Sequence, residues 1–282
     1  MKNIVFIGDS ITDGGSFIAL TEAFARMNGR ADFDRYINLG VSSENTTALT
    51  EPGHPFPRPC IFGRLGSLLE TVSGEWAVVM YGENDAIYRP FDESRFDLYK
   101  RGITKLVDEL HKASFKVALL TPTPFDAISF NGDLSYEYNC PCGSVYADYN
   151  AVMHKYAEWI RNCGIADKTV DVYNPIMQFL SSKRNTDSAF KTGDGIHQGK
   201  EGNFMIAKAI LSAVFDINIG TYESTPLPTA YALIAERSNL YHRYYKELVG
   251  HDNPYKEKKI SYDRLIKKVT RLDRKINKTF RK

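Results

Sequence analysis

The chain has 282 residues, of which 43% are hydrophobic and 25% charged, and its formal net charge is +2. This composition is ordinary for a globular protein, and the length predicts one large α/β domain with an appendage. No apolar run of roughly 18 residues occurs, so the sequence predicts no membrane span. A strand begins close to Met1, with no basic or long apolar leader before it. We therefore expect a cytoplasmic protein, unless a signal peptide has been removed.

Charge is distributed unevenly along the chain. Residues 237–282 contain 15 Lys and Arg against 5 Asp and Glu, a local charge of +10, whereas residues 1–236 carry a charge of −8. Such a division indicates separate structural units. We expect a principal domain at residues 1–218 and a basic helical C-terminal extension at residues 219–282.

Up to residue 215, segments rich in β-branched and aromatic residues alternate with helix-like segments. This alternation is typical of a parallel sheet with crossover helices. Strands are predicted at residues 3–7, 36–39, 76–81, 115–121 and 169–173. Helices are predicted at residues 12–28, 59–72, 94–113, 144–162 and 202–215. Strands and helices in this order predict a three-layer α/β/α sandwich.

The polar motifs of the chain lie where predicted strands end or just before a predicted helix. In open α/β sheets the functional groups gather beyond the carboxyl ends of the strands, so these motifs can share one edge of the sheet. In chain order they are Gly8-Asp9-Ser10, Gly40, Gly82-Glu83-Asn84-Asp85 and Asp194-Gly195-Ile196-His197.

Ser10 and His197 are a candidate nucleophile and base. Serine is a poor nucleophile unless a neighbouring base accepts its proton, and histidine is suited to that role near neutral pH. Asp194 lies three residues before His197, so its carboxylate can hold the imidazole in the tautomer that leaves the other nitrogen free for Ser10. Taken alone, a serine after a strand is more commonly a helix N-cap, so this interpretation depends on the other motifs.

Acyl transfer also needs hydrogen-bond donors for the oxyanion of the tetrahedral intermediate. The candidates are the N–H of Ser10 at a helix start, the N–H of Gly40 and the side-chain amide of Asn84. A glycine at a strand end is most often only a turn. If Gly40 does not face Ser10, a nearby amide would serve instead.

Together these motifs resemble those of the SGNH hydrolases, also called the GDSL lipase/esterase family, in residue type and in order. The resemblance implies a flavodoxin-like fold with a parallel five-stranded sheet, and hydrolysis of esters without a cofactor. It implies a catalytic triad of Ser10, Asp194 and His197, and an oxyanion hole of Ser10, Gly40 and Asn84. The segment after Gly40 matches the second motif of the family only loosely.

Several residues beside the motifs are expected to support or shape the site. Asp9 and Asp85 would brace their loops through backbone hydrogen bonds. Glu83 replaces the threonine or asparagine often found at this place in the family, so it is either a solvent-facing substitution or a contact with substrate. Residues 125–143 form a long loop whose aromatic side chains, Phe125 and Tyr136 among them, suit stacking on sugar or acyl surfaces. Burial of these aromatics in a packed loop is an equally good interpretation.

No metal or cofactor site is predicted. Of the four cysteines only Cys140 and Cys142 are close in sequence, and one intervening residue is poor spacing for zinc. The six histidines show no metal-binding spacing. Buried or incidental thiols are the better interpretation of the cysteines.

The C-terminal extension is predicted to form two helices, at residues 228–249 and from residue 261 onward, the second amphipathic with a dense Lys and Arg face. Such an extension can pack on the principal domain, pair with its copy in a homo-oligomer or lie on an anionic membrane. The opposite charges of the two units favour packing, within or between subunits. Because no nucleic-acid-binding module accompanies the charge, no nucleic-acid partner is predicted.

The leading hypothesis is a serine esterase that removes short acyl groups, acetyl above all, from a carbohydrate or a similar polar small-molecule ester. An O-acyltransferase would form the same acyl-enzyme and pass the acyl group to a sugar hydroxyl. Lysophospholipase or thioesterase activity also fits the family resemblance. A binding module that has kept the fold without the activity is a further alternative, against which the presence of every motif argues.

Overall fold

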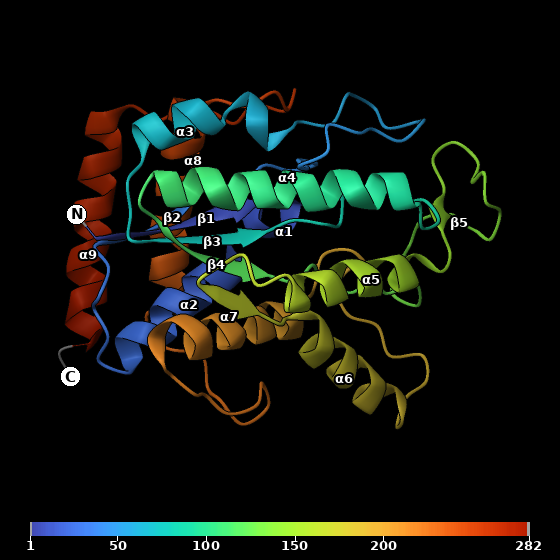
Figure 1. The fold of residues 1–282 in the computed structure, drawn as a ribbon. Helices are drawn as coiled ribbons and strands as arrows, with labels where there is room; N and C mark the ends of the chain where they lie inside the picture. The colour runs from blue at the N-terminus through green and yellow to red at the C-terminus, as the bar shows by residue number, and fades with distance from the viewer. Residues whose placement is uncertain (1, 281–282) are drawn as a thin grey trace.

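A parallel five-stranded sheet lies between layers of helices in the computed structural model of this chain (Figure 1). The structure describes residues 2–280. The strand order is β2-β1-β3-β4-β7, and each neighbouring pair is parallel. The predicted three-layer α/β/α architecture is confirmed, and each predicted strand is present. The strands are β1 (Asn3–Gly8), β2 (Arg35–Asn38), β3 (Trp76–Met80), β4 (Lys116–Leu120) and β7 (Lys168–Val170).

The two faces of the sheet bury separate apolar clusters. Along β1, Val5 and Ile7 belong to one cluster, whereas Ile4 and Phe6 belong to the other. Successive side chains of a strand alternate between faces, and helices cover both faces, so every residue of β1 and β3 is buried. The main covering helices are α4 (Glu93–Lys112) and α5 (Tyr149–Asn162) on the first face, and α2 (Ser16–Met27) and α7 (Lys200–Phe215) on the second.

Two predicted helices are interrupted in the structure. The helix predicted at residues 12–28 is divided into α1 (Ser10–Asp13) and α2, because the chain turns at Gly15. Gly15 has a φ of 71°, a conformation that favours glycine. The helix predicted at residues 59–72 consists of a 3₁₀ turn, η1 (Ile61–Gly63), and α3 (Leu65–Thr71).

Two further elements begin or end at residues other than those predicted, because hydrogen bonds to other segments intervene. The helix predicted from residue 144 starts at Tyr149, because β6 (Val145–Tyr146) pairs with β5 (Leu134–Ser135) instead. The strand predicted at residues 169–173 ends at Val170, and α6 (Tyr173–Arg184), which was not predicted, follows it. Thr121 Oγ1 accepts the N–H groups of Val172 (2.9 Å) and Tyr173 (3.0 Å), and these bonds turn the chain into the helix.

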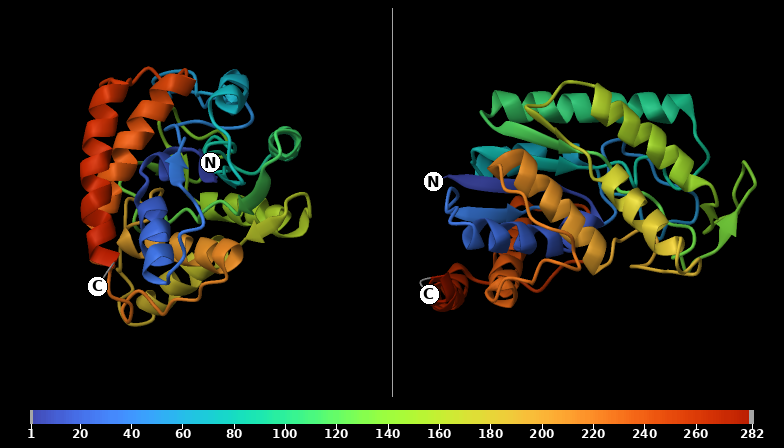
Figure 2. Two further views of the ribbon diagram at one scale, coloured as in Figure 1. Left: turned by 90° about the vertical axis from the view of Figure 1, so that its left-hand side faces the viewer. Right: turned by 90° about the horizontal axis from the view of Figure 1, so that it is seen from below.

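The C-terminal extension forms α8 (Tyr231–Val249) and α9 (Tyr262–Phe280), which lie side by side at the edge of the molecule (Figure 2). α8 contacts β2 and α2, and α9 packs on α8. The predicted apolar face of α9 is therefore buried within the chain and is not available for pairing with a second copy. The division at residue 218 stays a prediction. The buried apolar residues of α9 are Leu265, Val269, Leu272 and Ile276.

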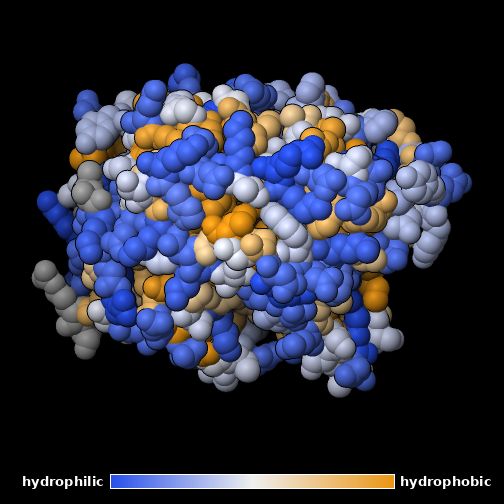
Figure 3. Space-filling model, viewed as in Figure 1, coloured by the Kyte–Doolittle hydropathy of each residue, from blue (hydrophilic) through white to orange (hydrophobic). Residues whose placement is uncertain are grey.

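The surface is mainly hydrophilic on the face shown in Figure 3, where hydrophobic residues form small separate patches. Within residues 2–280, none of the helices combines the length and the apolar character that crossing a membrane requires. The cytoplasmic location expected from the sequence stays a prediction. The exposed face of α9 is strongly basic, with Arg264, Lys267, Lys268, Arg271, Arg274, Lys275 and Lys278.

The docking of α9 can be tested with Leu272→Ala. Leu272 is buried between α9 and α8, so we expect the free energy of unfolding to fall by about 2–4 kcal/mol, through lost apolar contacts and the cavity that remains. Urea unfolding followed by circular dichroism measures the change. Lys268→Ala, on the exposed face of the same helix, is the control and should shift stability by less than about 0.5 kcal/mol. Equal losses in the two variants would contradict the docking.

Candidate active site

Ser10, His197 and Asp194 form one chain of hydrogen bonds. Ser10 Oγ lies 2.8 Å from His197 Nε2, and His197 Nδ1 lies 2.8 Å from Asp194 Oδ2. When Nδ1 donates to the carboxylate, Nε2 is the nitrogen that can accept the serine proton. The structure thus brings together the three side chains that the sequence singled out, across a separation of 187 residues between Ser10 and His197.

Ser10 is placed by the carboxyl end of β1, because α1 begins at this residue directly after the strand. Asp9 caps α1, and its carboxylate accepts the N–H of Ile11 at 3.0 Å, as the expected bracing role requires. Burial raises the pKa of Asp9 to about 7, although the hydrogen bond from Ile11 opposes the rise. The N–H of Ser10 has no acceptor among the described residues, so it remains a free donor beside the hydroxyl.

The carboxylate of Asp194 stabilises the loop that carries His197. Asp194 Oδ1 accepts the N–H groups of Ile196 (3.0 Å) and His197 (2.7 Å). Burial alone would raise the pKa of Asp194, but the hydrogen bonds from His197 and from these backbone groups hold it below its ordinary value. Gly195 has a φ of 91°, and a Cβ there would lie 2.7 Å from Asp126 O. The loop therefore requires glycine at this position.

Gly40 was predicted to supply an oxyanion donor, and the structure argues against that assignment. Its N–H donates to Asn38 Oδ1 at 2.8 Å, so the group is not free for a substrate oxygen. Ser43, in the next turn, has a φ of 65°, and its N–H has no acceptor among the described residues. Ser43 is therefore the nearby amide that can take the place of Gly40. Only the fold reveals this conformation, because no residue type marks it in the sequence.

The side chain of Asn84 faces the same turn and is fixed in one orientation. Arg58 donates to Asn84 Oδ1 at 2.7 Å, and the hydroxyl of Tyr88 donates to the same oxygen at 3.2 Å. The amide nitrogen therefore points the other way, where it donates one hydrogen to Glu44 O at 3.1 Å and has a second to offer. Arg58 also forms a bidentate pair with Glu51, at 2.5 and 2.7 Å. No motif identified Arg58 in the sequence.

Glu83 does not face solvent, contrary to one of its two predicted roles. The residue is 2% exposed, and neither carboxyl oxygen has a hydrogen-bond partner among the described residues. Both oxygens are shielded, so the side chain does not offer the predicted substrate contact either. Burial, and secondarily the neighbouring Asp9, raises the pKa of Glu83 well above its ordinary value.

Asp85 braces the loop after β3, as predicted. Asp85 Oδ1 accepts both the N–H and the hydroxyl of Thr46 at 2.7 Å. Burial raises the pKa of Asp85 to about 6, while the hydrogen bonds from Thr46 oppose the rise.

The two aromatic candidates for substrate binding have different environments. Phe125 is 2% exposed and packs against Phe130 and Tyr149 in the core, so its predicted role in stacking on substrate is wrong. Tyr136 is 85% exposed and follows β5 in a loop that projects from the body (Figure 1). Its part in substrate binding stays a prediction.

One group of side chains has the geometry of a cation site. Carboxylate oxygens of Asp13 and Glu257 and a ring nitrogen of His242 lie within 4.8 Å of one another. The ammonium of Lys246 lies 2.6 Å from Asp13 Oδ1 and 3.6 Å from Glu257 Oε1. Lysine thus supplies at this place the positive charge that a metal ion would bring.

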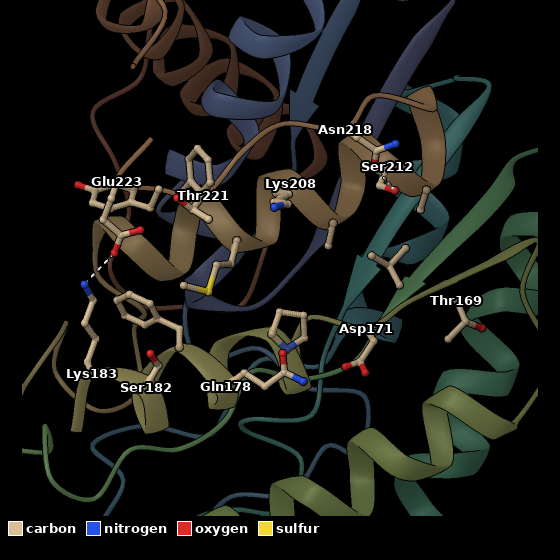
Figure 4. A pocket seen from close by; sticks show the side chains of 18 residues that line it. Thr169, Asp171, Gln178, Ser182, Lys183, Lys208, Ser212, Asn218, Thr221 and Glu223 are labelled. Atoms are coloured by element: carbon tan, nitrogen blue, oxygen red, sulfur yellow. Dashed lines mark hydrogen bonds and ion pairs between the residues drawn. The ribbon is translucent and has the colours of Figure 1, made fainter. Parts of the chain in front are cut away.

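A cavity of about 710 Å³ lies between α6 and α7 (Figure 4). Apolar side chains such as Phe179 and Met205 line it, and Lys183 forms an ion pair with Glu223 (2.7 Å) at its rim. None of the residues of the hydrogen-bonded chain borders this cavity. The candidate catalytic residues therefore lie at the carboxyl edge of the sheet and outside this cavity.

The burial of Glu83 predicts how stability depends on pH. Above its ordinary pKa of 4.5, the unfolded chain releases the Glu83 proton while the folded chain keeps it. This residue therefore lowers stability as pH rises towards the folded pKa, by at most about 1.4 kcal/mol per pH unit. Glu83→Gln removes that dependence, so the stability of the variant relative to the wild type should increase as pH rises above about 5 in urea unfolding. Glu236→Gln, at an exposed position on α8, should leave the slope unchanged. If stability depends on pH in the same way in Glu83→Gln and in the wild type, Glu83 is not a neutral buried acid in the folded protein.

The chain is similar to proteins that share this fold. A family model described as the GDSL-like lipase/acylhydrolase family matches residues 6–203. A gut microbial diltiazem-metabolizing enzyme is 16% identical over 75% of this chain with a TM-score of 0.58, and the match spans 46% of that enzyme's own chain. A variant of an acetyl xylan esterase from Geobacillus stearothermophilus is 17% identical over 74% of this chain and 93% of its own, with a TM-score of 0.54. The acetyl xylan esterase AlAXEase is 19% identical over 74% of this chain and 98% of its own, with a TM-score of 0.51. No curated protein matches this chain significantly in sequence.

At these identities the solved structures establish the fold alone. The family match establishes more, because it extends over most of the chain and includes Ser10, Asn84, Asp194 and His197. The chain belongs to the GDSL-like lipase/acylhydrolase family and is a serine ester hydrolase.

Proposed function

We propose that this hydrolase removes short acyl groups, acetyl above all, from carbohydrate or similar polar esters, with Ser10 as the nucleophile. The observation that carries the proposal is the hydrogen-bonded chain of Ser10, His197 and Asp194 at an open surface. The side chains of His197 and Asp194 are 48% and 52% exposed, so an ester on a bulky polar alcohol can reach them. Two structurally similar proteins are acetyl xylan esterases, which supports this substrate class.

The proposed reaction follows from the hydrogen bonds that join Ser10, His197 and Asp194. Ser10 Oγ attacks the ester carbonyl carbon while His197 Nε2 takes the hydroxyl proton, and Asp194 stabilises the imidazolium through Nδ1–H. The tetrahedral intermediate collapses when its C–O bond to the alcohol breaks and His197 returns the proton to the leaving oxygen. Water, deprotonated by His197, then attacks the acyl-enzyme, which releases the carboxylic acid and restores the Ser10 hydroxyl.

The oxyanion donors in this proposal are the N–H of Ser10, the amide nitrogen of Asn84 and the N–H of Ser43. Each has a hydrogen that is not used within the described part of the chain. Ser43 replaces Gly40, whose N–H is bonded to Asn38. Preorganised donors of this kind commonly contribute more than any other single term to acyl transfer.

The role of Ser10 is tested with Ser10→Ala and p-nitrophenyl acetate, butyrate and octanoate. We expect kcat to fall by about 1,000-fold or more, because the nucleophile is lost. Turnover by the wild type should decrease as the acyl chain lengthens, and mass spectrometry should find an acyl adduct on Ser10. Ser67→Ala, at an exposed serine of α3, should retain full activity.

The same assay separates the alternatives. An acyl adduct that is released slowly in water, but rapidly when a sugar is added as acyl acceptor, would favour an O-acyltransferase. Preference for octanoate would favour a lipid esterase. A folded protein that gives neither adduct nor turnover would leave the binding module as the remaining interpretation.

The role of Arg58 in orienting Asn84 is tested with a double-mutant cycle. Asn84→Ala should lower kcat by about 100-fold to 1,000-fold. Arg58→Lys should lower kcat by about 10-fold, because one ammonium cannot contact both Glu51 and Asn84 as the guanidinium does. In the Asn84→Ala background, Arg58→Lys should have little further effect. Arg101→Lys, at an exposed position on α4, is the control. Equal losses in both backgrounds would show that Arg58 does not act through Asn84.

A further inference from the structure

Asp13 connects the nucleophile helix to two other segments. It lies three residues after Ser10 in α1. Its Oδ2 accepts the N–H (3.2 Å) and the hydroxyl (2.5 Å) of Ser42, and its Oδ1 accepts from His242 Nε2 (2.7 Å) and Lys246 Nζ (2.6 Å) of α8. Burial alone would raise the pKa of Asp13, but hydrogen bonds and charge from His242 and Lys246 hold it well below its ordinary value. Asp13 is therefore an ionised bridge between the turn at Ser42 and the C-terminal extension.

His242 reaches this bridge as a buried side chain of α8. The residue is 5% exposed, its Nδ1 lies 2.8 Å from Asn38 O, and its Nε2 faces the Asp13 carboxylate. Both ring nitrogens thus lie at hydrogen-bond distance from oxygen atoms, one of β2 and one of α1. The charged groups that face His242 are Asp13 from α1, Lys246 from α8 and Glu257 from the segment before α9.

A second contact holds the same turn from the other side of Ser42. Asn253, which is 4% exposed, donates from Nδ2 to Ser42 O at 2.8 Å. The extension thus fixes the N–H and hydroxyl of Ser42 through Asp13, and its carbonyl through Asn253. The next residue is Ser43, whose left-handed conformation persists only where the surroundings impose it.

The cluster is not needed merely to attach α8. The apolar contacts of α8 with α2 and α9 already do so, and buried ion pairs are generally no more stabilising than apolar side chains of similar volume. Directional hydrogen bonds instead hold the groups that they join in defined positions.

We propose that His242, Lys246 and Asn253 of the C-terminal extension are positioning residues for the oxyanion side of the active site. They hold Asp13 and Ser42 so that the N–H of Ser43 points at the ester oxygen. This inference rests on the proposed function, in which Ser43 is an oxyanion donor. It gives the extension a part in catalysis without any contact with substrate.

The test uses Asn253→Ala and His242→Gln in the full chain, with Asn239→Ala, an exposed position on α8, as the matched control. Hydrolysis of p-nitrophenyl acetate should show kcat lowered by about 10-fold in the first two variants, with KM changed by less than about twofold, because only transition-state contacts are misplaced. Hydrogen–deuterium exchange should become faster in peptides that contain residues 41–44. Asn239→Ala should change neither quantity.

Leu272→Ala serves as a second control, because it lowers stability without touching this cluster. If it slows kcat and accelerates exchange at residues 41–44 as much as Asn253→Ala does, the effect is general destabilisation and the proposal is wrong. Unchanged exchange in both test variants, or faster exchange with unchanged kcat, also overturns it. If the wild type shows no Ser10-dependent turnover, the proposed function fails, and the exchange data alone then decide whether the extension fixes this turn.

Discussion

The hydrogen bond between Ser10 Oγ and His197 Nε2, 2.8 Å long, is the contact on which the rest of the site depends. Its two ends are placed by different elements, Ser10 by the end of β1 and His197 by the loop before α7. The helices that follow these residues, α2 and α7, pack against each other on one face of the sheet. Phe24 and Phe204 meet edge to face across that contact, with ring centroids 5.7 Å apart. Apolar packing therefore fixes a polar bond that neither segment could fix alone.

Around this bond the protein buries carboxyl groups in two different states. Asp13 and Glu51 have cationic partners that hold their pKa values below the ordinary range against the effect of burial. Among residues 2–280, Asp9 and Glu83 have no such direct partner, and burial raises their pKa values. Burial penalises a charge unless a specific partner compensates for it. Asp194 is not buried in this way, because its side chain is 52% exposed. Hydrogen bonds from the His197 side chain and from backbone N–H groups nevertheless hold its pKa down, so it can stabilise an imidazolium.

The C-terminal extension illustrates how a general electrostatic tendency becomes a specific structure. Its charge of +10 against −8 predicted attraction to the principal domain. In the fold, largely buried ion pairs join the two units: Arg237 pairs with Glu22 of α2, and Lys246 pairs with Asp13 of α1 at 2.6 Å. Arg237 also pairs at 2.7 Å with Asp273 of α9, within the extension. Most basic residues of α9 remain exposed. Net charge therefore indicated that the units associate, while apolar burial and a small number of ion pairs determine how they do so.

Local sequence patterns were enough to predict the alternation of strands and helices, and to identify Ser10, His197 and Asp194 as the residues that hydrogen-bond in series. Both depend on local patterns: the apolar runs that helices cover on both faces, and the polar motifs that begin at strand ends. The sequence could not identify the donor near Gly40, because the bond from Gly40 N–H to Asn38 and the conformation of Ser43 arise from packing. For the same reason it missed Arg58, and it could not place Glu83 in the interior. Arg58 and Asn84 lie 26 residues apart, and even the bond between the near neighbours Gly40 and Asn38 depends on how this turn packs. Such contacts therefore form only when the chain has folded.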